Sequence, residues 1–155
     1  MDKVRLRRIR WYLAIMIAGL VASGVTAFPL TAELKLMTGF WPHPWLVQVR
    51  DALVDTDTKY PFLAYGTDWL AFAHLMIAAA FIGPWRDPLK NRWIIDWALI
   101  CCIGVIPLAL LCGPIRGIPF FHRLIDCSFG VFGAIPLLCL RRELIQAERA
   151  ISSSS

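Results

Sequence analysis

Residues 11–30 read WYLAIMIAGLVASGVTAFPL, a stretch without a single charged side chain. As an α-helix this stretch would be about 30 Å long, which matches the hydrocarbon core of a bilayer. Basic residues precede it, as they precede the apolar core of a signal peptide, but it is long for that role and three comparable stretches follow. We therefore predict a retained membrane-spanning helix.

The three further apolar stretches are residues 68–84, 93–112 and 120–140. The third of the four predicted spans contains Pro107, which lacks an N–H donor and is expected to kink its helix. The sequence thus predicts an all-α fold, a membrane-embedded four-helix bundle that forms a single domain over residues 1–155.

The composition agrees with a membrane protein. Of the 155 residues, 58% are hydrophobic and the mean hydropathy is +0.61, whereas soluble domains contain about 45–50% apolar residues. A small soluble domain buries only about 70% of the surface of its unfolded chain, so lipid is the natural environment for the excess apolar surface. The net charge of +5 does not indicate nucleic acid, because the basic residues cluster at the ends of apolar stretches.

The positions of the Lys and Arg residues predict the orientation. One side of the membrane carries a dense set at the two termini and in the turn between the second and third spans: Lys3, Arg5, Arg7, Arg8, Arg10, Arg86, Lys90, Arg92, Arg141, Arg142 and Arg149. The other side carries fewer, diluted by acidic residues: Lys35, Arg50, Lys59, Arg116 and Arg123. The positive-inside rule therefore predicts cytoplasmic N and C termini. We expect the inner membrane of a bacterium.

The long connection 31–67 is then the outer loop. Within it, Trp45, Leu46, Val49 and Leu53 recur at helical spacing, and Pro44 suits a first helical position. This pattern predicts an amphipathic helix lying at the outer interface, or alternatively a plug over the mouth of the bundle.

Small residues within the spans indicate close packing between helices. They occur in the first, second and fourth spans: Gly19, Ser23, Ala78, Ala79, Ala80, Gly130, Gly133 and Ala134. We expect a tight bundle that forms a homo-oligomer or joins a larger membrane complex.

Ionisable side chains within lipid-depth helices are costly and mark candidate sites. Six of them lie near the outer ends of the second and fourth spans or in the loop before the fourth: Asp68, His74, Arg116, His122, Arg123 and Asp126. His122 and Asp126 share a helix face at i,i+4, and Arg123 at i,i−3 can also reach Asp126. We predict a polar, outer-facing ligand pocket formed by these six residues.

Other interpretations of the same residues stay open. Arg123 and Asp126 can neutralise each other at the interface, with a purely structural role. His74 and His122 can supply two axial ligands to a b-type haem in an electron-transfer subunit. Asp68, His74 and Asp126 can form a proton or ion relay in an oligomeric transporter or channel. On the opposite side, Asp96 lies at i,i+4 from Arg92, a spacing that predicts an ion pair.

No catalytic signature is present: the sequence contains no GxSxG, P-loop, HExxH or strand-borne GxGxxG motif, so we predict a non-enzymatic protein. No metal-ligand spacing appears, and no CxxC pair occurs among the five cysteines, Cys101, Cys102, Cys112, Cys127 and Cys139. Apart from the haem alternative, no cofactor is expected. The segments FLAYGTDWLAFAH and GPIRGIPFFHRLIDCSFG resemble those of small bacterial four-helix inner-membrane proteins. That resemblance spans most of the chain and implies the membrane fold, but no activity and no catalytic residue.

Overall fold

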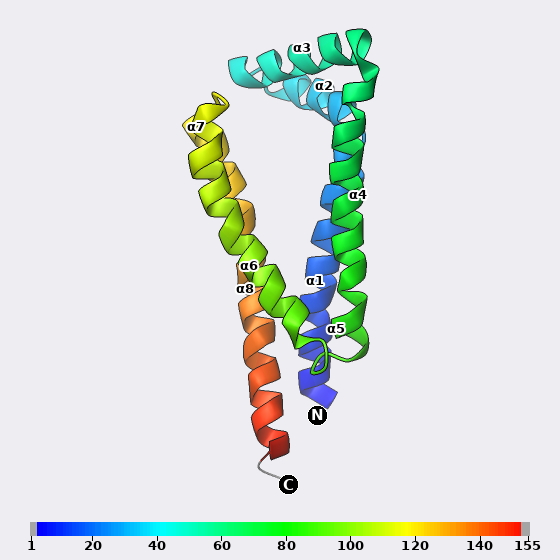
Figure 1. Ribbon diagram of the computed structural model, residues 1–155, viewed down its shortest axis with the longest axis vertical. Coiled ribbons are helices and arrows are strands. Elements are labelled where there is room, and N and C mark those ends of the chain that lie inside the picture. The colour runs from blue at the N-terminus through cyan, green and yellow to red at the C-terminus, as the bar shows by residue number, and fades with distance from the viewer. Residues whose placement is uncertain (1–2, 153–155) are drawn as a thin grey trace. The chain divides into compact units, whose positions relative to one another are not determined.

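The computed structural model describes residues 3–152 and is helical, with no strand in that range (Figure 1). In chain order the elements are α1 (Lys3–Ala27), α2 (Leu30–Phe40), α3 (Pro44–Lys59), the 3-10 turn η1 (Pro61–Leu63), α4 (Tyr65–Ala80), α5 (Ile82–Arg86), α6 (Arg92–Pro107), the π-helical η2 (Leu108–Cys112), α7 (Gly113–Ile115) and α8 (Phe120–Ser152). The predicted all-α fold class is confirmed.

Four helical segments are long and apolar enough to cross a membrane: Lys3–Ala27, Pro61–Arg86, Arg92–Ile115 and Phe120–Ala150. Each contains most or all of one predicted span. The segments extend beyond the apolar stretches because charged residues continue the same helices. The basic turns before Trp11 belong to α1, and α8 continues to Ser152. These four helices indicate a multi-pass membrane protein.

The connection between the first two spans contains two helices rather than one. Pro29 interrupts the chain after α1, and α2 follows it, which the sequence did not predict. The predicted helix is present as α3, with Pro44 in its first turn. His43 caps α3, because its Nδ1 accepts a hydrogen bond from the Trp45 N–H at 3.2 Å. The position of α3 at an interface stays a prediction.

The helices group into two compact units, which we describe separately. Unit 1 comprises the described residues up to Ile17 together with those from Ala80 onward. Unit 2 comprises Ala18–Ala79. Unit 1 therefore holds the first part of α1 and all of α5 to α8, whereas unit 2 holds the end of α1, the whole connection and nearly all of α4.

In unit 1, α6 and α8 lie side by side (Figure 1). Gly130 of α8 permits this close approach, because a Cβ there would lie 2.5 Å from the carbonyl oxygen of Cys102 on α6. Beyond Pro107 the chain continues as the π-helical η2. Pro107 has no N–H to donate to the helical ladder, and the next N–H, that of Leu108, donates to both the Gly104 and Val105 carbonyls. The helix type thus changes directly after Pro107, and the predicted kink at this residue stays a prediction.

In unit 2, α1 and α4 meet in a similar way. A Cβ on Gly24 of α1 would lie 2.9 Å from the carbonyl oxygen of Ala71 on α4 and 2.9 Å from Cδ2 of Leu75. The adjacent α2 and α3 pack against each other. A polar contact also joins them, in which the Arg50 Nη1 donates to Thr38 Oγ1 at 3.1 Å.

Candidate functional site

A cavity of about 430 Å³ lies in unit 2, where three segments of the chain meet. We call it the acidic pocket. Its lining comes from the α1–α2 junction, from α3, and from η1 with the start of α4: Phe28, Pro29, Leu30, Thr31, Ala32, Leu53, Thr56, Asp57, Leu63, Ala64, Thr67 and Asp68. Prolines shape two of these segments. Pro29 separates α1 from α2, and Pro61 begins the short η1 turn before α4.

Two carboxylates, Asp57 and Asp68, line this pocket without a basic side chain among the lining residues. The Thr31 hydroxyl donates a hydrogen bond to Asp57 Oδ2 at 2.6 Å, and this bond orients the carboxylate. Lys59, the cation next to Asp57 in the sequence, pairs instead with Asp55, at 2.9 Å. The two carboxylates therefore leave the pocket with uncompensated negative charge.

Of these pocket residues, the sequence predicted only Asp68. It lies in the first turn of α4, where the helix dipole favours a negative charge. Asp57 and Thr31 were missed as site residues. Residues 31 and 57 are far apart in the chain, and only the folding of α2 against α3 brings them together.

His74, the other predicted site residue in unit 2, bonds to its own helix. Its Nδ1 lies 2.8 Å from the Leu70 carbonyl oxygen. A carbonyl only accepts, so the Nδ1–H is the donor of this hydrogen bond. This bond fixes the ring within α4.

The other four predicted site residues lie in unit 1. His122 Nε2 is 3.9 Å from Asp126 Oδ1, which agrees with the face predicted from their i,i+4 spacing. Arg116 follows α7 and is exposed. Its backbone N–H donates to the carbonyl oxygens of Cys112 and Gly113, both at 3.1 Å. Backbone hydrogen bonds within this segment thus hold the turn that precedes α8.

Arg123 does not pair with Asp126 in the structure. Its side chain covers Gly113, at a place where a Cβ would have no room, and its guanidinium carbon lies 5.2 Å from the centre of the Phe120 ring. The Arg123 Nε is buried and has no hydrogen-bond partner among residues 3–152. Its long side chain is held by packing and a ring contact rather than by the carboxylate.

The six predicted residues are thus divided between the units: Asp68 and His74 belong to unit 2, and the other four to unit 1. A common pocket of all six stays a prediction, as does a haem held by His74 and His122. Among the residues that the structure describes, no group of three or more His, Cys, Asp or Glu side chains is placed to hold a metal ion.

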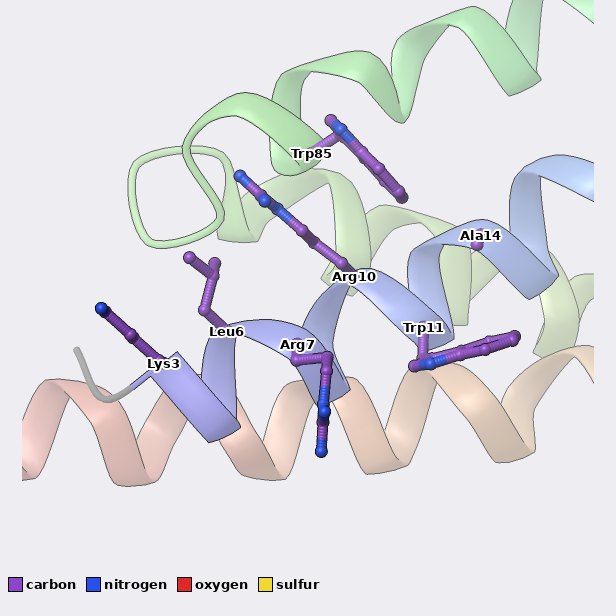
Figure 2. A pocket seen from close by; sticks show the side chains of 7 residues that line it. All are labelled: Lys3, Leu6, Arg7, Arg10, Trp11, Ala14 and Trp85. Atoms are coloured by element: carbon purple, nitrogen blue, oxygen red, sulfur yellow. The ribbon is translucent and has the colours of Figure 1, made fainter.

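A second cavity, of about 450 Å³, lies in unit 1 and has the opposite charge (Figure 2). We call it the basic pocket. It is lined by α1 and by one residue of α5: Lys3, Leu6, Arg7, Arg10, Trp11, Ala14 and Trp85. The guanidinium carbon of Arg10 lies 5.9 Å from the centre of the Trp85 ring. None of the lining residues that the structure describes carries a carboxylate.

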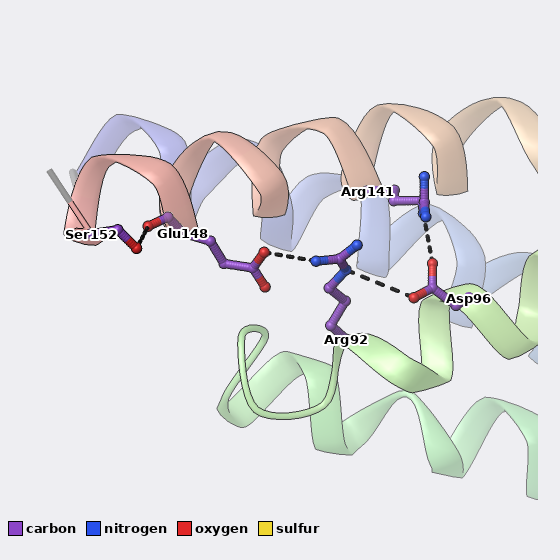
Figure 3. Close-up of polar contacts among 5 residues, drawn as sticks. All are labelled: Arg92, Asp96, Arg141, Glu148 and Ser152. Carbon is purple, nitrogen blue, oxygen red and sulfur yellow. Dashed lines mark hydrogen bonds and ion pairs between the residues drawn. The ribbon is translucent and has the colours of Figure 1, made fainter.

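Other charges of unit 1 are engaged in ion pairs between helices. Arg92 contacts Glu148 of α8 at 2.7 Å and Asp96, its predicted partner, at 3.7 Å (Figure 3). Arg141 of α8 contacts the same Asp96 at 2.6 Å. The Arg92–Asp96 pair is confirmed, whereas the bonds from α6 to α8 were not predicted.

The same region ties α1 to α8. Glu143 of α8 lies 3.3 Å from the Arg5 Nε and 3.1 Å from an Arg8 nitrogen. With the pairs between α6 and α8, these contacts hold three helices of unit 1 together.

Comparison with known proteins adds no relative. No family model matches the chain, and no curated protein or solved structure matches it either.

Proposed function

We propose that the chain is a non-enzymatic, multi-pass membrane protein that binds a small organic cation in the acidic pocket. The observation that supports this is the lining of a 430 Å³ cavity by Asp57 and Asp68 without a basic side chain. Cavities of this size suit small molecules, which are held by apolar walls and a few placed polar groups.

The remaining lining favours an organic cation over a bare metal ion. Phe28, Leu30, Leu53 and Leu63 provide apolar walls, whereas a metal ion would need a closed shell of oxygen ligands. A ligand with an apolar body and a substituted ammonium group uses both halves of the lining. Its charge lies beside the carboxylates, and its body displaces water from the walls.

The membrane setting is part of the same proposal. The four apolar helices and the asymmetric Lys and Arg distribution support a bacterial inner-membrane protein with cytoplasmic termini. In that orientation the acidic pocket, which lies in the connection 31–67 and its flanking turns, faces the outer side. Assembly as a homo-oligomer or within a larger complex stays a prediction from the small residues.

Benzyltrimethylammonium is a suitable probe, since its cationic group and ring match the two parts of the lining. We expect isothermal titration calorimetry of the detergent-solubilised protein to detect binding. Asp57→Asn and Asp68→Asn should each weaken it roughly tenfold, because each removes one unit of attraction for the cation.

Asp55→Asn is the matched control, because Asp55 lies on the same helix, pairs with Lys59 and does not line the pocket. Its affinity should equal that of the wild type. Neopentylbenzene, the neutral isostere, should not displace the cation. Unchanged binding in the Asp57→Asn, Asp68→Asn double variant would refute the proposal, and so would an equal loss in Asp55→Asn.

A further inference from the structure

We propose that unit 1 binds one anionic phospholipid in the basic pocket, with the lipid phosphate held by Lys3, Arg7 and Arg10. This site is separate from the acidic pocket and does not depend on the function proposed for it. The cavity volume of about 450 Å³ accommodates a phosphate and the glycerol region attached to it.

The cations of α1 fall into two sets. Arg5 and Arg8 both contact Glu143, so these two arginines share one carboxylate of α8. Lys3, Arg7 and Arg10 line the basic pocket instead, and among the described residues none of the three has an ion pair within 4.0 Å. Three basic side chains thus line one cavity to which no described residue contributes a carboxylate, an arrangement that attracts an anion. They point in different directions in Figure 2, so their long side chains have to turn toward a bound anion.

Arginine suits a phosphate ligand in particular, because its planar fork donates two parallel N–H bonds to phosphate oxygens. Arg10 contacts Trp85, and Figure 2 shows the two side chains near each other, Arg10 rising from α1 and Trp85 coming from α5. A cation–π contact at this distance does not use the guanidinium N–H groups, which can still donate to a ligand. The site therefore has one arginine oriented before the ligand arrives.

The other lining residues favour a lipid over a free phosphate. Leu6, Trp11, Ala14 and Trp85 give the pocket an apolar side, and the Trp11 side chain is 66% exposed. From Trp11 onward α1 continues as the uncharged stretch 11–30. A ligand whose phosphate lies among the cations can extend its acyl chains along this stretch, and tryptophan is the residue typical of that boundary.

Native mass spectrometry of the full chain in a non-ionic detergent measures this binding directly. The probes are dioctanoyl phosphatidylglycerol, dioctanoyl phosphatidylcholine and glycerol 3-phosphate. We expect a one-lipid adduct with phosphatidylglycerol, at least tenfold weaker binding of phosphatidylcholine, and no displacement by glycerol 3-phosphate. The first lipid carries the net negative charge, the second has the same chains but is zwitterionic, and the third has the phosphate but no chains.

The Lys3→Gln, Arg7→Gln, Arg10→Gln variant should bind phosphatidylglycerol on the order of a hundredfold more weakly, since each basic side chain contributes several-fold. The Lys90→Gln, Arg142→Gln, Arg149→Gln variant changes the net charge equally, and its three positions lie in unit 1 but outside the pocket. It should bind like the wild type.

Arg7→Gln alone guards against a triple variant that fails to fold, because Arg7 has neither an ion pair nor a ring contact among the described residues. It should weaken binding about fivefold. Equal binding of the two lipids, an equal loss in the control variant, or full displacement by glycerol 3-phosphate would overturn the proposal. Equal binding of the two lipids would mean that the cavity recognises only the acyl chains. An equal loss in the control variant would mean that the net charge of unit 1, and not the pocket, attracts the lipid. Full displacement by glycerol 3-phosphate would mean that the pocket binds a free anion rather than a lipid.

Discussion

Units 1 and 2 are alike in how their helices meet and opposite in the charge of their pockets. In unit 1, Gly130 of α8 brings α6 within contact of its backbone, and in unit 2 Gly24 does the same between α1 and α4. The two cavities have similar volumes, about 450 and 430 Å³. Their described linings differ, because one contains three cations and no carboxylate, and the other two carboxylates and no cation.

Volume therefore does not distinguish the two pockets, whereas the ion pairing of the neighbouring charges does. Unit 1 pairs Asp96, Glu143 and Glu148 with arginines, and leaves the lining cations of the basic pocket without an ion pair among the described residues. Unit 2 pairs Lys59 with Asp55 and leaves Asp57 in the cavity. Side chains of one type, on one helix, thus either form an ion pair or face a cavity, according to the partner that folding supplies.

The largest expected effect is on stability, at the glycine where α8 packs closely against α6. Gly130→Ala should lower the unfolding free energy by about 2 kcal/mol, because the new methyl group would lie 2.5 Å from the Cys102 carbonyl oxygen and must push α6 from α8. The better helix propensity of alanine offsets only about 1 kcal/mol of a larger steric cost. Unfolding in mixed detergent and SDS micelles measures the change.

Gly104→Ala is its control. A Cβ on Gly104 meets nothing within 4 Å, so this variant should be as stable as the wild type or slightly more so. If Gly130→Ala and Gly104→Ala unfold alike, the close approach of α6 and α8 is not what stabilises unit 1.

The apolar spans could be predicted from the sequence because a helix in lipid needs a long uncharged stretch, and that requirement is local. The helix from Pro44 was also predictable, since Pro44 and the spacing of Leu46 and Val49 are local signals. The α2 helix was missed because the connection 31–67 was expected to contain one helix rather than two, α2 and α3.

The sites depend on distant pairings and were only partly predictable. Asp68 could be proposed from its position near the end of a span, but its pocket needs Asp57 and Thr31, which tertiary folding supplies. Arg123 shows a second limit. Helical spacing places Phe120 and Asp126 equally near it, three residues away on either side, and the packing over Gly113 selects the ring.

Neutralising Glu143 tests whether compensated cations are structural. Glu143→Gln should lower the unfolding free energy by about 1.5 kcal/mol, because the Glu143 side chain is 13% exposed and contacts both Arg5 and Arg8. This loss of unfolding free energy is smaller than that for a fully buried ion pair, because the Arg8 side chain is 54% exposed and solvent screens its pair with Glu143.

The readout that separates the two sets of cations is lipid affinity. Glu143→Gln should not weaken phosphatidylglycerol binding, since Glu143 does not line the basic pocket. Glu33→Gln, the same change at a residue for which the structure gives no ion pair, should leave both stability and affinity as they are. A fall in lipid affinity with Glu143→Gln would mean that the two sets act together.

The smallest effect concerns the bond that orients Asp57. Thr31→Val keeps the shape of the side chain but removes the hydroxyl that donates to Asp57 Oδ2 at 2.6 Å. We expect about threefold weaker benzyltrimethylammonium binding, because the carboxylate loses its fixed direction. Thr58→Val is the control, since the Thr58 hydroxyl donates to the Val54 carbonyl of its own helix and does not reach the pocket. If Thr31→Val lowers only the melting temperature and leaves the affinity unchanged, the Thr31–Asp57 bond serves the packing of α2 on α3 and not the ligand.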